Sequence, residues 1–129
     1  MLSIASMNMA WADSLGIFTH RQPFLLTPLL EAYTQKTGVE FQTVYAPKGL
    51  AQRLQAEGSR TKADLVLTVD ISRIKELADA ELLAPMSSDI INRQVPANLR
   101  DANDTWTALS LRARIIAVSK DRVGKEAIT

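Results

Sequence analysis

Short apolar runs and helical patterns alternate along this chain, and the alternation restricts its fold more than any other feature. Strand-like runs occupy residues 15–19, 39–45 and 63–69. Patterns with the period of a helix occupy residues 28–37 and 50–57. Such an order predicts an α/β fold, with a mostly parallel sheet and helices on both of its faces.

Residues with strong local preferences mark the expected ends of these elements. Thr27-Pro28 fits a helix N-cap and first helical position, while Gly38 and Gly58 fit the positions that follow helices. Leu65-Val66-Leu67 is a continuous apolar run, typical of a strand buried on both faces. We therefore expect this run to lie inside the sheet.

The patterns after residue 70 are weaker. Ser72 is expected to cap a third helix that carries Ile74 and Leu77. The remaining expected elements are helical turns at 88–93 and 96–100 and strands at 106–109 and 115–118. We expect the strand at 115–118 to lie beside the first three.

Length and composition exclude several classes of protein. The 129 residues, 47% of them hydrophobic, suffice for one domain with a hydrophobic core. The net charge of +1, without a basic or acidic block, gives no basis for binding nucleic acid. The absence of Cys excludes disulfides, thiolate metal sites and a Cys nucleophile. No apolar run approaches the roughly 20 residues of a membrane-spanning helix.

The first twelve residues are kept out of the predicted fold. Ala10-Trp11-Ala12 has the Ala-x-Ala pattern of a signal-peptidase site, but no basic region precedes it. Residues 1–12 are therefore interpreted as either the remnant of a signal peptide or a disordered tail. The expected folded domain is 13–118, and 119–129 continues out of it.

Ligands of open α/β sheets bind beyond the carboxyl ends of the strands. This rule selects three segments, residues 19–22, 45–46 and 68–70. His20 is either a site residue or a surface histidine, and Tyr45 is either a site residue or a half-buried strand residue. Asp70 either belongs to the site or begins a helix, where a carboxylate favours the helix dipole.

No complete catalytic set is present. Spacing does not support a Ser-His-Asp arrangement from His20 and Asp70, and there is no glycine-rich phosphate loop. A single-domain phosphoryl receiver fits the length, with Asp70 as acceptor, but it needs an acidic pair after the first strand to hold Mg²⁺. That place holds the basic Thr19-His20-Arg21. Arg112 and Arg114 flank an apolar run and are either solvated or hold an anion.

Six segments carry a more specific signal because they follow one another in a fixed order. They are FTHRQPFL (18–25), KGLAQRLQAEG (48–58), ADLVLTVDISR (63–73), VPANLRD (95–101), LSLRAR (109–114) and SKDRV (119–123). In register from about Leu15 to Thr129, the chain resembles the periplasmic ferric-iron-binding proteins of bacterial ABC transporters. The resemblance implies the first lobe of a type II periplasmic-binding-protein fold, with a second lobe beyond Thr129.

The resemblance also implies a ligand set. Family members grip Fe(III) with two adjacent tyrosines of the second lobe, hard oxygen donors for a hard cation. One branch adds His and Glu from the first lobe, at positions that are Gln22 and Val69 here. The chain therefore resembles the branch that uses tyrosines and a synergistic carbonate.

In that branch the resemblance implies anion binding by Gln22 and Arg112, with Arg21 beside them, because a guanidinium fork fits a planar carbonate. Phe18 and His20 replace the two tyrosines of the family's opening motif. Phe18 is expected to pack in the core, and an iron-ligand role for His20 stays open. We expect Gln22 and Arg112 to share one anion at the same cleft edge.

The resemblance implies a substrate-binding component rather than an enzyme, located in the periplasm, with ferric iron as cargo and an inner-membrane ABC permease as partner. Another small solute on the same fold is the alternative. Fe(III) with carbonate is expected for the full-length family, whereas this chain, lacking the tyrosine pair, is expected to bind iron weakly or not at all. An uncovered sheet edge is expected to leave it marginally stable and prone to self-association.

Overall fold

The computed structural model describes residues 14–119, 121 and 122. The chain divides into two compact units, Met1–Met86 and Ser87–Thr129, and each is described by itself. The segment predicted as a tail or signal remnant, 1–12, lies outside the described residues, as does most of 119–129. The predicted boundaries at these places stay predictions.

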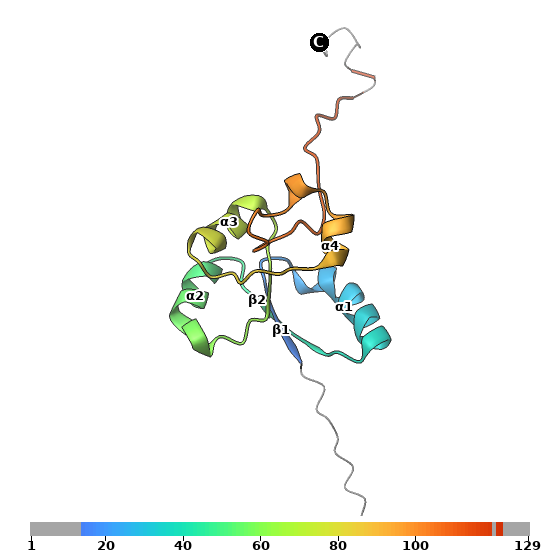
Figure 1. The fold of residues 1–129 in the computed structure, drawn as a ribbon. Coiled ribbons are helices and arrows are strands. Elements are labelled where there is room, and N and C mark those ends of the chain that lie inside the picture. Colours follow the sequence, from blue (N-terminus) through green and yellow to red (C-terminus); the bar gives the residue numbers. More distant parts are fainter. Residues whose placement is uncertain (1–13, 120, 123–129) are drawn as a thin grey trace, which may run out of the picture. The chain divides into compact units, whose positions relative to one another are not determined.

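The first unit is built on a parallel three-stranded sheet (Figure 1). Its strands are β1 (Leu15–Thr19), β2 (Phe41–Tyr45) and β3 (Leu65–Leu67), in the order β2-β1-β3. Both neighbours of β1 run parallel to it, with Thr19 opposite Tyr45 on one side and opposite Leu67 on the other. The predicted adjacency of the first three strands is confirmed.

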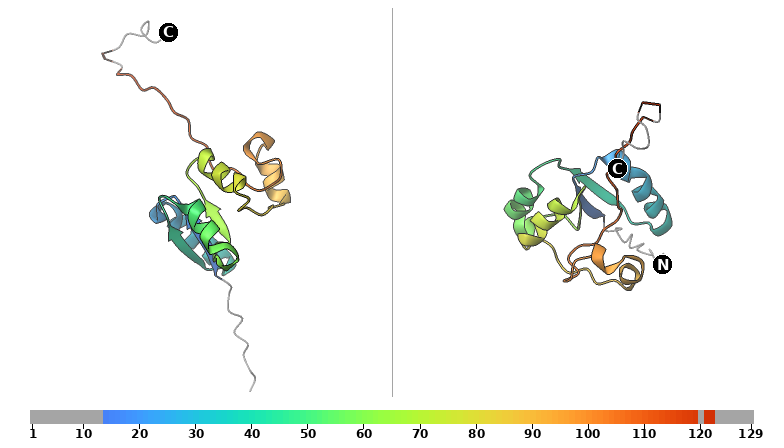
Figure 2. Two further views of the ribbon diagram at one scale, coloured as in Figure 1. Left: turned by 90° about the vertical axis from the view of Figure 1, so that its left-hand side faces the viewer. Right: turned by 90° about the horizontal axis from the view of Figure 1, so that it is seen from above.

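Helices cover both faces of this sheet, as predicted. Figure 2 shows α1 (Pro23–Thr37) on one side of the strands and α2 (Leu50–Glu57) and α3 (Ile71–Asp79) on the other. The short 3₁₀ helix η1 (Gly58–Arg60) extends α2. Because β1 is the central strand, it receives side chains from both layers, and four of its five residues are buried.

The main core lies between β1 and the α2–α3 layer. Phe18 packs there with Leu50 and Leu54 of α2 and with Leu77 of α3, and all four are buried. This placement makes Phe18 a core residue, as expected. The neighbouring Ile17 points to the other face because side chains alternate along a strand, and α1 contributes its buried Leu26 on that side.

Helix α1 begins at Pro23, five residues before the predicted start, so the assignment of Thr27-Pro28 as the cap was wrong. Pro23 occupies the first helical position, where its fixed φ and missing N–H are no disadvantage. Pro28 lies inside the helix, and the Thr27 hydroxyl instead donates to the Pro23 carbonyl at 3.0 Å. The predicted end is confirmed, since Gly38 follows the helix with φ +76° and donates to Thr34 O.

Two predictions around β3 were also wrong. The strand is not buried on both faces, because Leu65 is 40% exposed and the other two residues are only half-buried. It also lies at an edge of the three-stranded sheet and not inside it. The cap of α3 is Asp70 rather than Ser72, because the Asp70 carboxylate accepts a hydrogen bond from the Arg73 N–H. An apolar run therefore identified the strand but not its place in the sheet.

The second unit contains the two helical turns that were predicted. These are α4 (Asp89–Gln94), capped by Ser88, and the 3₁₀ helix η2 (Ala97–Leu99). A turn closes on Asp101, whose carboxylate accepts hydrogen bonds from Asn103 N–H and from the Thr105 backbone and hydroxyl. The Thr105 hydroxyl is the main reason that the pKa of Asp101 is lowered.

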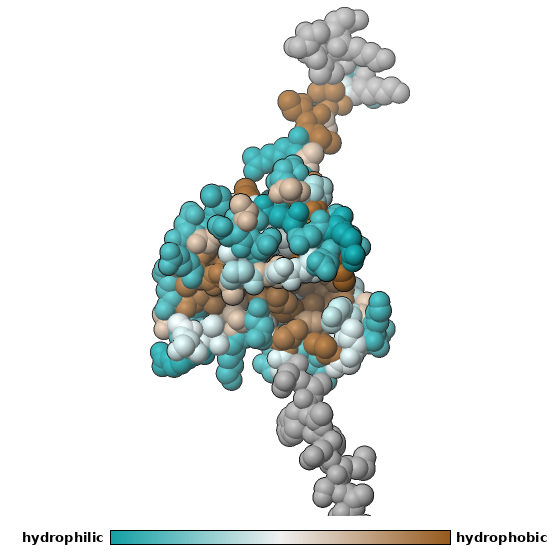
Figure 3. Space-filling view, viewed as in Figure 1, coloured by the Kyte–Doolittle hydropathy of each residue, from teal (hydrophilic) through white to brown (hydrophobic). Residues whose placement is uncertain are grey.

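The strands predicted at 106–109 and 115–118 are not formed. Thr107 makes one isolated antiparallel bridge with Arg100, and the described part of 109–122 contains no strand. A strand requires a hydrogen-bonded neighbour, and this segment has none among the described residues. Its apolar side chains face outward, with Ile115 82% and Ile116 91% exposed, and they give the brown surface of the extended segment in Figure 3.

Candidate functional site

The carboxyl ends of the three strands meet at one edge, as the sequence predicted. The Ala46 N–H donates to the Thr19 carbonyl at 2.9 Å, which joins the ends of β2 and β1. The His20 N–H donates to the Leu67 carbonyl at 3.0 Å, which joins β1 to β3. These two bonds bring residues 19–22, 45–46 and 68–70 together in the first unit.

His20 occupies the middle of this edge. Its side chain is half-buried, and its Nδ1 is enclosed without a hydrogen-bond partner among the described residues. Partial desolvation lowers the pKa of His20, and the positive charge of Arg73 lowers it further. Asp70 and Glu76 act in the opposite direction but do not outweigh these effects. The imidazole is therefore held toward its neutral form.

Asp70 has the role of a helix cap, one of the two interpretations of the sequence. Its Oδ1 accepts hydrogen bonds from the Ser72 hydroxyl at 2.5 Å and from the Arg73 N–H at 3.0 Å. An oxygen that satisfies the first turn of a helix is already committed to that turn. The carboxylate accordingly organises the start of α3 beside His20.

Arg73 is a member of this edge that sequence reasoning missed. Its Nη1 donates to the Pro47 carbonyl at 2.9 Å, and its Nε lies 3.5 Å from Asp70 Oδ2. The guanidinium thereby links the loop after β2 to the start of α3. Its position three residues after Asp70 was the available signal, because residues at this spacing lie on one face of a helix.

The segment that follows β1 is shaped by Thr19, which is fully buried. Its hydroxyl accepts a hydrogen bond from the Arg21 N–H at 2.8 Å. Gln22 is exposed and is the N-cap residue of α1, although its side chain makes no capping hydrogen bond. The turn thus presents the Gln22 amide and the half-buried Arg21 beside the N-terminus of α1, where anions are favoured.

The other predicted residues divide between the two units. Tyr45 is the exposed last residue of β2, and Val69 is half-buried between β3 and α3. Arg112 and Arg114 belong to the second unit, where both are exposed. The expected sharing of one anion by Gln22 and Arg112 joins residues of different units and stays a prediction.

Polar groups of several kinds converge at this edge of the sheet. Among the described residues there is no group of three His, Cys, Asp or Glu side chains that could hold a metal ion. No helix in the described part of the chain is long and apolar enough to cross a membrane. The groups that do converge are the His20 imidazole, the Gln22 amide, the cations Arg21 and Arg73, the Asp70 carboxylate and backbone N–H groups, a set suited to a small polar ligand.

A parallel α/β unit with polar groups at the carboxyl ends of its strands defines a ligand-binding domain. The chain belongs to the bacterial extracellular solute-binding protein family, whose model matches residues 21–129. Family members are binding proteins, and the phosphoryl-receiver hypothesis has no support from this membership.

Three similar proteins carry names that refer to iron. The crystal structure of ferric iron-binding protein A from Mannheimia haemolytica, in an open conformation, superposes with a TM-score of 0.83 and 42% identity, over 88% of this chain and 36% of that one. Iron uptake protein A1 of Synechocystis is 29% identical over 91% of this chain and 33% of its own length. The major ferric iron-binding protein of Neisseria gonorrhoeae is 30% identical over 74% of this chain and 30% of its own.

The chain therefore spans about a third of the length of these relatives. This agrees with the resemblance to the first lobe of ferric-iron-binding proteins.

Proposed function

We propose that this chain forms part of the substrate-binding component of a bacterial Fe(III) ABC transporter, with ferric iron and a synergistic anion as its cargo. The observation that supports this most is the agreement between fold and sequence with the Mannheimia protein, at a TM-score of 0.83 and 42% identity. The proposal places the protein in the periplasm, where it delivers iron to an inner-membrane permease.

In this proposal the chain supplies the residues that bind the anion. The tyrosine phenolates that coordinate iron in the family come from the second lobe. Gln22 and Arg112 hold the carbonate, and Arg21 adds positive charge beside it. The N-terminus of α1 follows Gln22 directly and supports an anion there. His20, held toward its neutral form, contacts the cargo from the middle of the edge.

The domain boundaries form part of the same proposal. Residues 13–118 contribute the lobe, residues 1–12 are the remnant of a signal peptide or a tail outside the fold, and residues 119–129 begin the crossover to a second lobe. The two tyrosines of the family belong to that second lobe. The 129-residue chain alone is therefore expected to bind Fe(III) weakly or not at all.

A chimera tests the function directly. Residues 15–118 would replace the matching part of Mannheimia ferric iron-binding protein A, which retains its own remaining chain. The chimera is expected to develop the visible tyrosinate-to-iron charge-transfer band when titrated with ferric citrate and bicarbonate. The isolated chain, titrated in parallel, should develop none.

Two substitutions in the chimera examine the anion half. Arg112→Ala and Gln22→Ala should each weaken iron retention against a citrate competitor, because the carbonate loses a partner. Arg114→Ala is the matched control, since it removes a nearby exposed arginine to which the proposal gives no role. A folded chimera without the band, or equal retention in all three variants, would contradict the proposal.

A further inference from the structure

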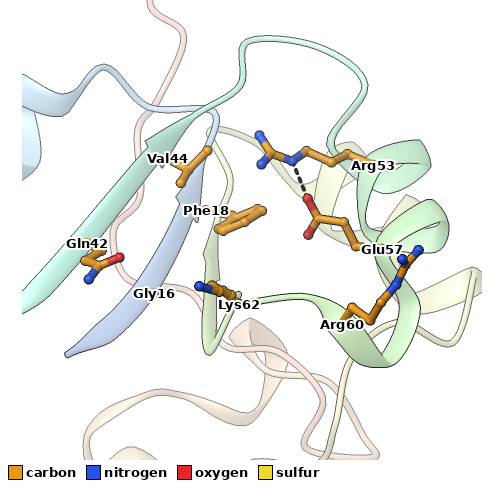
Figure 4. Close-up of a pocket in the computed structure, with 8 residues that line it drawn as sticks. All are labelled: Gly16, Phe18, Gln42, Val44, Arg53, Glu57, Arg60 and Lys62. Atoms are coloured by element: carbon orange, nitrogen blue, oxygen red, sulfur yellow. Dashed lines mark hydrogen bonds and ion pairs between the residues drawn. The ribbon is translucent and has the colours of Figure 1, made fainter. Parts of the chain in front are cut away.

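A hollow lined by several charged residues lies away from the carboxyl-end edge, on the face of the sheet that α2 covers (Figure 4). Its volume is about 310 Å³, and β1, β2, α2, η1 and the segment before β3 contribute to its wall. Gly16 and Gln42, the second residues of β1 and β2, line it together with Lys62. It therefore reaches toward the amino ends of the strands, away from His20 and Asp70.

The charges around this hollow are unequal. Three cations, Arg53, Arg60 and Lys62, line it with one carboxylate, Glu57. Glu57 already accepts hydrogen bonds from Arg53 Nε at 2.7 Å and from the Thr61 hydroxyl at 2.8 Å. The negative charge of Glu57 is thus paired with Arg53. The three cations and one carboxylate together leave an excess of two positive charges around the hollow.

The two excess cations have no partner of their own among the described residues. Within residues 14–119, 121 and 122, the side chains of Arg60 and Lys62 make no ion pair or hydrogen bond. Arg53 is fixed differently, because its guanidinium carbon lies 4.8 Å from the centre of the Phe18 ring while its Nε is held by Glu57. Figure 4 shows this arrangement, with Gln42 and Val44 on the strand side.

A guanidinium held in place by Glu57, with two exposed cations on the same wall, can bind negatively charged oxygen atoms. Apolar groups, among them Val44 and Phe18, contribute more of the surface of the hollow than polar groups do, so an occupant with a carbon skeleton between charged ends fits it. Its volume lies at the small end of the range for ligand sites, roughly 300–1,000 Å³. We propose that this hollow binds a small organic dianion, whose two negative charges balance the excess of two positive charges on its wall.

The proposal is independent of iron binding and is tested on the 129-residue chain. Succinate is the probe, and succinamide is a neutral molecule of nearly the same shape. Each would be titrated at constant ionic strength while the amide NMR signals of Gly16, Gln42 and Lys62 are followed. Succinate should give saturable shifts at these residues, and succinamide should give none.

The double variant Arg60→Gln/Lys62→Gln removes the two unpaired charges. The dissociation constant for succinate should rise about tenfold or more, as expected when charge-assisted hydrogen bonds are lost. The matched control is Lys36→Gln/Lys48→Gln, which removes two charges from residues outside the hollow and should leave the dissociation constant unchanged.

Gln42→Glu provides a second measurement that keeps all cations in place. The exposed Gln42 accepts this nearly isosteric change, and the added negative charge should weaken succinate binding by a similar factor. Non-saturable shifts, equal binding of succinamide, or an unchanged dissociation constant in both the double variant and Gln42→Glu would each overturn the proposal.

Discussion

Gly16 and Asp64 are joined by two hydrogen bonds that run in opposite directions between the start of β1 and the approach to β3. The Gly16 N–H donates to Asp64 Oδ2 at 2.8 Å, and the Asp64 N–H donates to the Gly16 carbonyl at 2.9 Å. Gly16 is buried, so its N–H has no alternative partner in solvent. This pair fixes where β3 begins to follow β1.

Asp64→Ala is expected to lower the free energy of unfolding by about 1–3 kcal/mol, because it leaves the buried Gly16 N–H without an acceptor. Asp64→Asn should lose much less, since its side-chain oxygen still accepts. Urea denaturation followed by circular dichroism measures both. Equal stability of Asp64→Ala and the original chain would contradict the assigned role.

Gly16→Ala is expected to be more damaging. A Cβ at this position would lie 1.8 Å from the Lys62 carbonyl oxygen, a backbone atom that moves only if the chain moves. We expect a loss of about 3 kcal/mol from this overlap. Gly38→Ala is the control, because nothing lies within 4 Å of its Cβ and only its left-handed backbone opposes the change, at about 1–2 kcal/mol. A larger loss of stability for Gly38→Ala than for Gly16→Ala would contradict the expected overlap with the Lys62 carbonyl oxygen.

Asp70→Ala removes the cap of α3 and should lower the stability by about 1 kcal/mol. Asp70→Asn should retain most of it, because asparagine also accepts the Arg73 N–H. The control Asp79→Ala, at the last residue of α3, should be neutral or slightly stabilising, since a carboxylate opposes the dipole there. Thermal melts of the three variants give the comparison, and equal losses at Asp70 and Asp79 would rule out capping.

His20 predicts a specific dependence of stability on pH. Its pKa is lowered in the folded protein, so below about pH 6.5 the unfolded chain takes up a proton more readily than the folded one. The contribution of His20 to the free energy of unfolding is therefore fully present above that pH. It declines as the pH falls toward the lowered pKa of His20 in the folded protein. Urea midpoints at pH 7.5, 6.0 and 5.0 should fall more steeply for the original chain than for His20→Gln.

Carboxylates such as Glu57 and Asp101, whose pKa values are lowered, lose their contribution at more acidic pH in both proteins. The difference in urea midpoint between the original chain and His20→Gln therefore reports the effect of the histidine alone. A difference that does not change between pH 7.5 and 5.0 would exclude this role of His20.

The outer edge of β3 is expected to drive self-association of the 129-residue chain. Strand β3 pairs only with β1 in the described part of the chain, and Leu65 is exposed at that edge. Unpaired strand edges pair with other chains. Analytical ultracentrifugation should show concentration-dependent dimers or larger species, and Leu65→Lys should reduce them.

The control for this experiment is Leu29→Lys, which changes an exposed leucine on α1 and leaves the strand edge intact. It should reduce association much less. A stable monomer of the unmodified chain, with a sharp transition at high temperature, would show that the open edge has no such consequence.

The sequence predicted those parts of the fold that local pattern determines. The three strands, α2 and the end of α1 at Gly38 follow from periodicity and from backbone preferences. The start of α1 did not, because Pro23 and Pro28 both fit a first helical position and only the burial of Leu26 in the earlier turn distinguishes them. The segment 115–118 has the apolar pattern of a strand. A strand also needs a hydrogen-bonded neighbour, and the apolar pattern of a segment does not show whether such a neighbour exists.

The candidate site was predictable to the same degree. The rule for carboxyl ends correctly brought His20, Tyr45 and Asp70 to one edge because it depends only on parallel strands. The link made by Arg73 depends on the Pro47 carbonyl, which is distant in sequence. This contact follows from the assembled fold and has no local signal, unlike the ion pair of Arg73 with Asp70, which the spacing of three residues indicates.

The order β2-β1-β3 also determines what the candidate binding edge requires in order to form. The central strand β1 comes first in the sequence, and both of its neighbours follow later. Each pairing therefore closes a loop, whose entropy cost must be offset by the contacts that the pairing makes. The His20 N–H obtains its acceptor, the Leu67 carbonyl, only when β3 has paired with β1, so the candidate binding edge is complete only after the pairing that is most distant in sequence.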